Sequence, residues 1–511
     1  MTTLRDSLGN WLPDARRRLA DLRAEPSLEH VGTVEHVGDG VATIAGLPQT
    51  RIDELLRFET GALALALKVD QRQVGCVLLN GAETVVAGTR AFNTGNFARV
   101  PVGEKMLGRT VDPLGHPLDG GPAIETPHTA PVDRPAPAIA DRDRVSQPMM
   151  TGLTVVDAMI PLGRGQRELI VGDRKTGKTA VAVDAIINQR DTDVICVYAA
   201  VGQETSTVGQ VIGAVHDHGA IDRCVFVVGE PDSPPGLQWI APYAACSIAE
   251  YFRDRGRDAL LVIDDLTKHA IIYRQLSLLL RNPPGREAYP GDIFYIHARH
   301  LERAAKLSED RGGGSLTAFP IAETQAGNLS AYIPTNLISI TDGQIYLEPK
   351  LFHEGQKPAV NVGLSVSRVG GQTQAPVMKR LAETLRLDYA QFLELEVFTR
   401  FGAITDERTR RTIEHGRRIR AILTQPEYRP LPLSRQVALL LAVSERKLDA
   451  VPLSEVERFK NDIATALAQR CPRTAARIEE TGDLKDDGRQ DLLDAIDACL
   501  APGAAKRDRT G

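Results

Sequence analysis

The sequence has few of the features that mark nucleic-acid-binding or membrane-spanning proteins. Only 5% of its 511 residues are aromatic, too few to favour the stacking platforms that bind single-stranded nucleic acid. Its 61 basic and 66 acidic side chains leave a net charge of −5, so no basic field favours such a partner either. Apolar runs such as 437–443 are too short to cross a bilayer, and the N-terminus has no apolar signal-peptide core. We therefore expect a soluble, cytosolic chain whose link to any membrane comes through a partner.

Cysteine is scarce and scattered. No CxxC pair and no Cys/His pair has the spacing of a metal site, and the composition excludes a disulfide scaffold. Cys196 and Cys224 lie in apolar, strand-like runs, so we expect buried free thiols in a reducing compartment.

Periodicity divides the chain into four parts. Residues 1–27 form a charged arm, and residues 28–95 carry short strand signals separated by turn residues, which predicts a small β-barrel domain. Residues 96–375 alternate apolar strands with helical segments, which predicts a mostly parallel α/β sheet buried on both faces. Over residues 376–511 the spacing becomes helical, which predicts a C-terminal α-helical bundle. The fold class is therefore multidomain α/β.

Local patterns assign individual segments. Residues 31–37 and 41–44, joined by Gly38-Asp39-Gly40, predict a hairpin. Ser454-Glu-Val-Glu457 has capping-box spacing and predicts the start of a helix. Further barrel strands are expected at 63–67, 77–81 and 83–86, sheet strands at 168–171, 194–198, 224–228, 259–263, 316–319 and 336–340, and one helix face at Leu381, Leu385, Tyr389 and Phe392.

The strongest chemical signal is a GxxxxGK[ST] phosphate loop between an expected strand and a helix-like segment. Backbone N–H groups of such a P-loop face the phosphates of ATP or ADP, and the following helix presents its positive end to them. Lys178 is expected to reach the β and γ phosphates, and Thr179 to offer its hydroxyl to Mg²⁺. The loop consists of Gly172, Asp173, Arg174, Lys175, Thr176, Gly177, Lys178 and Thr179.

Two further residues are candidates for the same chemistry. Asp264 ends the expected strand 259–263, where P-loop proteins need a carboxylate beside the water shell of Mg²⁺. Arg368 follows Gly363-Leu-Ser-Val-Ser367, whose small residues would let it project into a phosphate site as an arginine finger. On residue chemistry alone, a surface Asp pair and a surface salt bridge remain the alternatives, and the salt bridge is the better interpretation of Arg368.

Four longer stretches are more specific than the P-loop: residues 151–168, 264–275, 283–292 and 358–367. With them, the chain resembles the α subunits of F-type ATP synthases from about residue 28 to at least residue 445. The resemblance implies a β-barrel, a RecA-like P-loop domain and a helical domain. It also implies a ring of three α and three β subunits around a rotating central stalk, γ. A peripheral stalk and a membrane sector that conducts H⁺ or Na⁺ would complete the enzyme, with this chain peripheral on the cytoplasmic face of the bacterial inner membrane.

The resemblance also implies roles for single residues. Gln203 stands where the catalytic β subunit has a Glu that positions the attacking water, and an amide cannot accept the proton of that water. The chain's own site is therefore expected to be regulatory and non-catalytic. Arg368 becomes the finger inserted in trans into the neighbouring β site, and Phe352, Gln425 and Tyr428 lie where the family packs adenine.

The chain departs from the family pattern at several positions. Lys175 and Glu427 each replace a usual Gln, and Lys357 stands where Arg is common. Glu204-Thr205 replaces a basic pair, and the arm with Trp11 and Pro13 does not match the usual helix that seats the peripheral stalk. These changes suit a divergent or auxiliary copy of the enzyme.

Two other classes of ATP-binding protein fit the sequence less well. A self-sufficient homohexameric ATPase of related fold, such as a secretion ATPase or a Rho-like helicase, should carry Glu at position 203. Rho should also have an RNA-binding N-terminal domain, and residues 28–95 lack a basic-aromatic pattern. A small-molecule P-loop kinase does not fit the helical C-terminal third.

Overall fold

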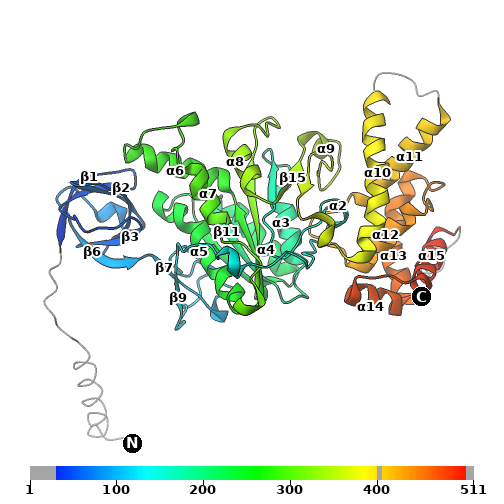
Figure 1. Cartoon of the computed structure of the whole chain (residues 1–511), viewed down its shortest axis with the longest axis horizontal. Coiled ribbons are helices and arrows are strands. Elements are labelled where there is room, and N and C mark those ends of the chain that lie inside the picture. Colours follow the sequence, from blue (N-terminus) through cyan, green and yellow to red (C-terminus); the bar gives the residue numbers. More distant parts are fainter. Residues whose placement is uncertain (1–29, 400–405, 502–511) are drawn as a thin grey trace, which may run out of the picture.

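The computed structural model describes residues 30–399 and 406–501, without the side chains of residues 397–399. A barrel, an α/β domain and a helical domain follow one another along the longest axis (Figure 1). None of the helices in these two ranges combines the length and the apolar character that a bilayer crossing requires. The predictions for the N-terminal arm, with Trp11 and Pro13, lie outside the described residues.

The N-terminal domain is a closed antiparallel barrel with the strand order β1-β2-β5-β4-β3-β6. The predicted hairpin is confirmed as β1 and β2, and its turn places Asp39 and Gly40 at positive φ, 51° and 80°. The strand predicted at 83–86 is wrong: Ala82–Thr84 is a 3₁₀ turn that follows left-handed Gly81 and is closed by a 2.7 Å bond from Thr84 Oγ1 to the Gly81 carbonyl. The strands are β1 (Val31–Gly38), β2 (Val41–Ala45), β3 (Glu54–Phe58), β4 (Leu63–Val69), β5 (Gln73–Leu78) and β6 (Arg90–Phe97).

The central domain contains an eight-stranded sheet with the order β16-β15-β10-β14-β13-β11-β12-β8. All pairs except β15 with β16 are parallel. A separate antiparallel pair, β7 (Arg99–Pro101) with β9 (Thr129–Pro131), lies outside it. The strands of the sheet are β8 (Thr110–Val111), β10 (Leu169–Gly172), β11 (Ile195–Val201), β12 (Cys224–Gly229), β13 (Asp258–Asp264), β14 (Ser315–Glu323), β15 (Gly343–Leu347) and β16 (Val366–Ser367).

Helices cover both faces of this sheet, because alternate residues of each strand point to opposite sides. Val197 packs in a core with the helices α5 to α8, whereas its neighbour Tyr198 packs in a core with α2 to α4. Cys196 and Cys224 are buried free thiols, as expected, and they occupy opposite positions on the neighbouring strands β11 and β12. The helices are α2 (Thr154–Met159), α3 (Lys178–Ile187), α4 (Thr205–Asp217), α5 (Pro235–Arg253), α6 (Leu266–Leu279), α7 (Ile293–Leu301), α8 (Tyr332–Ile340) and α9 (Pro349–His353).

One predicted sheet strand is wrong. Residues 336–340 are the second half of helix α8, and the strands on either side of the P-loop strand β10 are β14 and β15. The buried residues Ile333, Leu337 and Ile340 recur four and three positions apart, which is the spacing of one helix face. A short apolar run was therefore mistaken for a buried strand.

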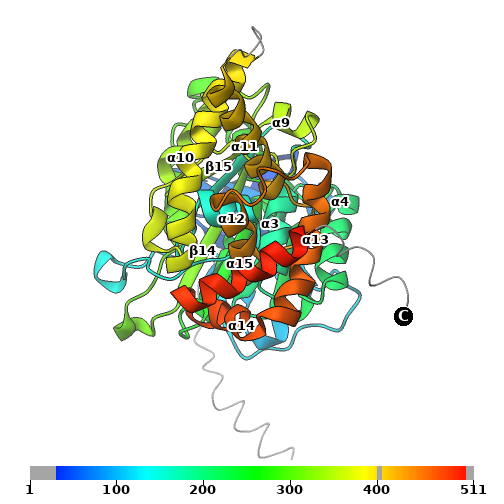
Figure 2. The same cartoon turned by 90° about the vertical axis from the view of Figure 1, so that its right-hand side faces the viewer.

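The C-terminal domain is helical, with α10 and α11 side by side and packed against the helices that follow them (Figure 2). The expected face of α10 is confirmed: Leu385, Tyr389 and Phe392 are buried and Leu381 packs against the same core. A helix also starts near Ser454, but its first residue is Leu453, its cap position is Pro452, and the predicted capping box is not formed. The helices are α10 (Pro376–Thr399), α11 (Glu407–Leu423), α12 (Leu433–Ser444), α13 (Leu453–Arg470), α14 (Pro472–Thr481) and α15 (Asp486–Leu500).

The contact between α10 and α11 gives a direct test of this packing. A Cβ atom added to Gly416 would lie 2.1 Å from Cγ of Phe392, a side chain that is fully buried. We expect Gly416→Ala to lower the free energy of unfolding by about 1–3 kcal/mol through overpacking. Urea unfolding followed by circular dichroism measures the change. Gly213→Ala on α4, where nothing lies within 4 Å of the new Cβ, is the control and should gain up to about 1 kcal/mol; equal behaviour of the two variants would contradict the packing.

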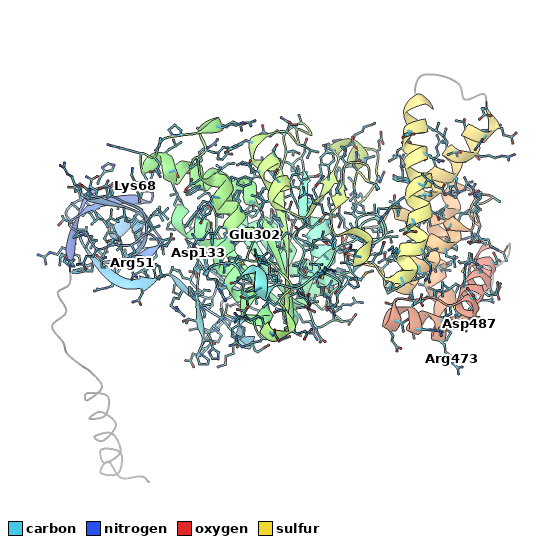
Figure 3. The ribbon with its side chains drawn as sticks, viewed as in Figure 1. Arg51, Lys68, Asp133, Glu302, Arg473 and Asp487 are labelled. Atoms are coloured by element: carbon cyan, nitrogen blue, oxygen red, sulfur yellow. The ribbon has the colours of Figure 1, made fainter. Side chains whose placement is uncertain are left out.

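Polar contacts join the barrel to the central domain. Nζ of Lys68, on β4, donates to the carbonyl oxygen of Leu280 after α6 at 3.0 Å. The same Nζ lies 3.5 Å from the carbonyl oxygen of Arg281. Asp133, which follows β9, forms an ion pair with Arg299 of α7 within the central domain. Both Lys68 and Asp133 lie where the two domains meet (Figure 3). The barrel is thus fixed to the side of the sheet that α5 to α7 cover.

Candidate nucleotide-binding site

The P-loop connects the end of β10 to the start of α3, as the motif requires. Gly172 ends the strand, and a Cβ atom there would lie 2.5 Å from the carbonyl oxygen of Leu347. Gly177 has a φ of 92° immediately before Lys178, the first residue of the helix. The loop therefore needs glycine at these two positions to turn closely enough for its N–H groups and the positive end of α3 to surround a phosphate.

Lys178 is held within the loop rather than in solvent. Its Nζ donates to the carbonyl oxygen of Asp173 at 2.6 Å and lies 4.0 Å from Glu323. The carboxylate of Asp173 accepts bonds from Thr324 Oγ1 at 2.5 Å and from the Gly327 N–H at 2.9 Å. Burial lowers the pKa of the Lys178 ammonium, against the opposing effect of the nearby carboxylates. A bound phosphate would supply the counter-charge that this buried cation needs.

The remaining loop side chains divide into two groups. Thr176 is buried, and its Oγ1 donates to the Asp173 carbonyl at 2.8 Å, which supports the turn. Arg174 and Lys175 are exposed on the rim, with Arg174 3.8 Å from Glu323. The charge that Lys175 adds to the family pattern therefore lies on the rim of the loop.

Asp264 and Thr179 meet across the site. Thr179 Oγ1 donates to Asp264 Oδ2 at 2.7 Å, and the buried hydroxyl of Tyr198 donates to the same oxygen at 2.8 Å. Hydroxyl and carboxylate oxygens are the hard ligands that Mg²⁺ prefers, usually beside waters and substrate phosphates. Within residues 30–399 and 406–501, no group of three or more His, Cys, Asp or Glu side chains could hold a metal by itself. The hydroxyl of Thr179 and the carboxylate of Asp264 are oxygen donors of the kind that fit a Mg²⁺ ion.

Gln203 is bound at both ends of its amide. Its Nε2 donates to Asp264 Oδ1 at 2.7 Å, and its Oε1 accepts from Lys268 Nζ at 2.8 Å. Lys268 Nζ also donates to the Gly202 carbonyl at 3.0 Å. This position therefore presents an uncharged amide whose oxygen and nitrogen are both hydrogen-bonded, and such a group cannot act as a general base.

The sequence did not single out Lys268 or Tyr198. Lys268 lies in one of the stretches that carry the resemblance and is the third residue of α6, but nothing in its local pattern pointed to Gln203. Tyr198 is indistinguishable from a core residue within the buried strand β11. The role of its hydroxyl group is shown only by the structure, in which β11 places it beside Asp264.

A cleft runs from the P-loop along α3. One side is formed by Thr176, Gly177, Ala180 and Val181, and the other by Phe352, Pro358 and Ala359. Asp184, Lys357, Gln425 and Glu427 complete the lining. The predicted residues Phe352 and Gln425 therefore lie in the same cleft as the loop, whereas Tyr428 is not part of the lining and contacts His218, with 6.2 Å between the ring centroids.

The amide of Gln425 is engaged within the fold. Its Oε1 accepts from the backbone N–H of Thr154 at 3.2 Å and from the Thr154 hydroxyl at 3.3 Å. Its Nε2 donates to the carbonyl oxygens of Gly152 at 2.8 Å and Arg429 at 2.7 Å. All the hydrogen-bonding capacity of the amide is used. Gln425 thus shapes the cleft and fastens α2 to the loop after α11.

Arg368 lies away from the P-loop of its own chain. It directly follows β16, which pairs with β15 through Ser367 and Gly343, whereas Gly172 at the start of the P-loop lies beside Leu347 at the other end of β15. Four residues along a strand correspond to about 13 Å. The side chain is exposed, and its guanidinium donates to the carbonyl oxygens of Thr341 at 3.1 Å and Ile338 at 3.3 Å. It is therefore directed toward the surface at the opposite end of the sheet.

Comparison with known proteins agrees with this geometry. Residues 152–367 match the model of the ATP synthase alpha/beta family, nucleotide-binding domain, and residues 374–499 match the ATP synthase alpha/beta chain, C terminal domain. "ATP synthase subunit alpha 3" of Paraburkholderia xenovorans (strain LB400) is 54% identical over 500 residues, which cover 98% of this chain and 94% of that protein. "ATP synthase subunit alpha 2" of Gluconobacter oxydans (strain 621H) is 52% identical over 98% of this chain and 99% of its own length. "ATP synthase subunit alpha 2" of Burkholderia pseudomallei (strain 1710b) is 56% identical over 90% of this chain and 68% of its own length. This chain therefore belongs to the ATP synthase alpha/beta family.

Proposed function

We propose that this chain is the alpha-type, non-catalytic subunit of an F-type ATP synthase. It would couple ion flow through a membrane sector to the synthesis or hydrolysis of ATP at the sites of a neighbouring β subunit. Relatives named as alpha subunits, matched over nearly the whole chain, support this role. The observation that carries it is Gln203, whose amide is bound between Asp264 and Lys268 where hydrolysis needs a carboxylate.

In this proposal the chain's own site binds ATP or ADP without hydrolysing it. Residues 172–179 hold the phosphates through their backbone N–H groups and through Lys178. Thr179 and Asp264 hold Mg²⁺, Asp264 through water, and the metal would neutralise phosphate charge and orient the phosphates. Phe352 and the apolar side of α3 enclose the base.

Arg368 acts on another subunit. Its exposed guanidinium lies at the end of the sheet opposite to its own P-loop, which supports a finger that enters the neighbouring β site in trans. There it would stabilise the negative charge that develops on the transferred phosphoryl group.

The partners follow from the same proposal. Three copies of this chain alternate with three β subunits around the central stalk γ, and a peripheral stalk holds the ring. The complex lies on the cytoplasmic face of the bacterial inner membrane, and this chain contacts the membrane only through the membrane sector. No nucleic-acid partner is expected.

A homohexameric ATPase of related fold is the alternative. Such an enzyme would have to hydrolyse ATP with Gln203 in place of the water-positioning carboxylate, and the bonds of that amide to Asp264 and Lys268 argue against it. The two proposals predict complexes of different subunit composition, so a measurement of that composition distinguishes them.

Gentle affinity purification of this chain from its native membranes, followed by native mass spectrometry, tests the proposal. We expect a complex with a second P-loop chain that carries Glu at the position of Gln203, together with stalk subunits and a membrane sector. A soluble homohexamer would overturn the assignment.

A further inference from the structure

The cleft beside the P-loop is narrow, and most of its lining residues are apolar. Its walls are the side of α3, at Ala180 and Val181, and the facing residues Phe352 and Pro358. A nucleotide whose phosphates occupy the loop would extend its base between these apolar surfaces. The polar groups at the edge of this cleft therefore decide which base is accepted.

Gln425 cannot read the base, because its amide already makes four hydrogen bonds to the protein. The other polar side chains of the lining, apart from the P-loop residue Thr176, are two carboxyl groups and one ammonium group: Asp184, Glu427 and Lys357. Asp184 is only 3% exposed, and its Oδ1 has no hydrogen-bond partner among the residues that the structure describes. The cleft thus contains a buried acceptor that a ligand could satisfy.

Lys357 and Glu427 lie at the outer edge of the same cleft. Their Nζ and Oε1 atoms are 3.7 Å apart, and the Lys357 ammonium lies 5.1 Å from the centroid of the Phe352 ring. A base stacked near Phe352 would therefore meet a carboxylate and a cation side by side. Burial and the neighbouring Glu427 raise the pKa of Asp184 to about 7.

These groups match the polar edge of guanine. Guanine presents two adjacent donors, N1–H and the N2 amine, beside the acceptor O6. A carboxylate accepts from both donors, and an ammonium group donates to O6. Adenine presents the N6 amine beside the acceptor N1, an arrangement that a glutamine amide pairs with at both ends. A carboxylate can accept a hydrogen bond from the N6 amine, but its second oxygen then faces the lone pair of N1, which is also an acceptor. A carboxylate therefore binds adenine less favourably than a glutamine amide does.

We propose that this nucleotide site accepts guanine nucleotides as well as ATP and ADP, and that Glu427 is the specificity-determining residue that admits guanine. The inference rests on the proposed function, because it requires that the chain's own site binds a nucleotide. Asp184 and Lys357 support Glu427 by offering a further acceptor and a donor to the same base edge.

Binding of GDP and of ADP to the purified full-length chain, measured by calorimetry with Mg²⁺ at pH 8, tests the proposal. We expect the dissociation constants for GDP and ADP to agree within tenfold. Glu427→Gln should weaken GDP relative to ADP by about tenfold or more, the discrimination typical of one bidentate pair. Glu455→Gln, an exposed change on α13, is the matched control and should leave the ratio unchanged.

The outcomes separate the two proposals. Tight binding of ADP with GDP more than tenfold weaker, or a ratio that Glu427→Gln leaves unchanged, would overturn the guanine proposal alone. Binding of neither nucleotide would overturn the proposed nucleotide-binding function and the guanine proposal with it.

Discussion

Arg368→Ala is expected to lower ATP turnover by the assembled complex by about 10³-fold, as removal of an arginine finger does in other phosphoryl-transfer enzymes. The exposed guanidinium of Arg368 makes two bonds to backbone carbonyl oxygens at the end of α8, both longer than 3 Å. The substitution removes only these two hydrogen bonds, so the chain should still fold and bind its own nucleotide. Steady-state hydrolysis by the purified complex measures the effect.

Two variants give this experiment its controls. Arg368→Lys keeps the charge but loses the planar fork, so most of the activity should still be lost. Arg473→Ala, on α14 and also exposed, should retain full turnover. The subunit composition of each complex is checked by native mass spectrometry. Normal turnover of a correctly assembled Arg368→Ala complex would show that Arg368 is not an arginine finger.

Lys178→Ala is expected to weaken nucleotide binding by this chain by about 100-fold or more, because charge-assisted bonds from a buried lysine to phosphate are among the strongest that a loop offers. Hydrolysis by the complex should fall much less than with Arg368→Ala, since in the proposed complex the chemistry takes place on the β subunit. The nucleotide that remains with the isolated subunit is measured by chromatography after denaturation. Lys105→Ala, an exposed change in the central domain, serves as the control.

Comparing Lys178→Ala with Arg368→Ala shows whether this chain's own site is catalytic. A complex in which Lys178→Ala abolishes hydrolysis as completely as Arg368→Ala would show that this chain's own site is catalytic. The hydrogen bonds of Gln203 to Asp264 and Lys268 predict instead that Lys178→Ala leaves most of the hydrolysis intact.

The strands that are buried on both faces could be predicted because they are continuous apolar runs. Residues 259–263 and 224–228 are examples, and both lie in the central sheet. The same criterion failed at 336–340, where five residues are too few to show whether apolar residues recur at strand or at helix spacing. The register of β15, the neighbour of the P-loop strand, had to come from the structure.

Within the site, the sequence indicated the phosphate loop, Asp264 and Gln203, and the structure brings these groups together. It could not indicate Tyr198 or Lys268, because their significance depends on contacts across strands β11 and β13 and helix α6. Nor could it show that the Gln425 amide is satisfied by Gly152 and Thr154, which are more than 270 residues away. Such assignments depend on tertiary neighbours, which local patterns do not contain.

The antiparallel strand β16 makes the two ends of the central sheet functionally different. Because it returns along β15, the P-loop and Arg368 come to lie at opposite ends of one sheet. A subunit with such unlike ends cannot satisfy both of them in a two-fold pair, but it can in a head-to-tail ring that closes on itself. In the ring proposed for this chain, every step would have the same polarity, so the assembly would distinguish clockwise from anticlockwise even before a central stalk turned inside it.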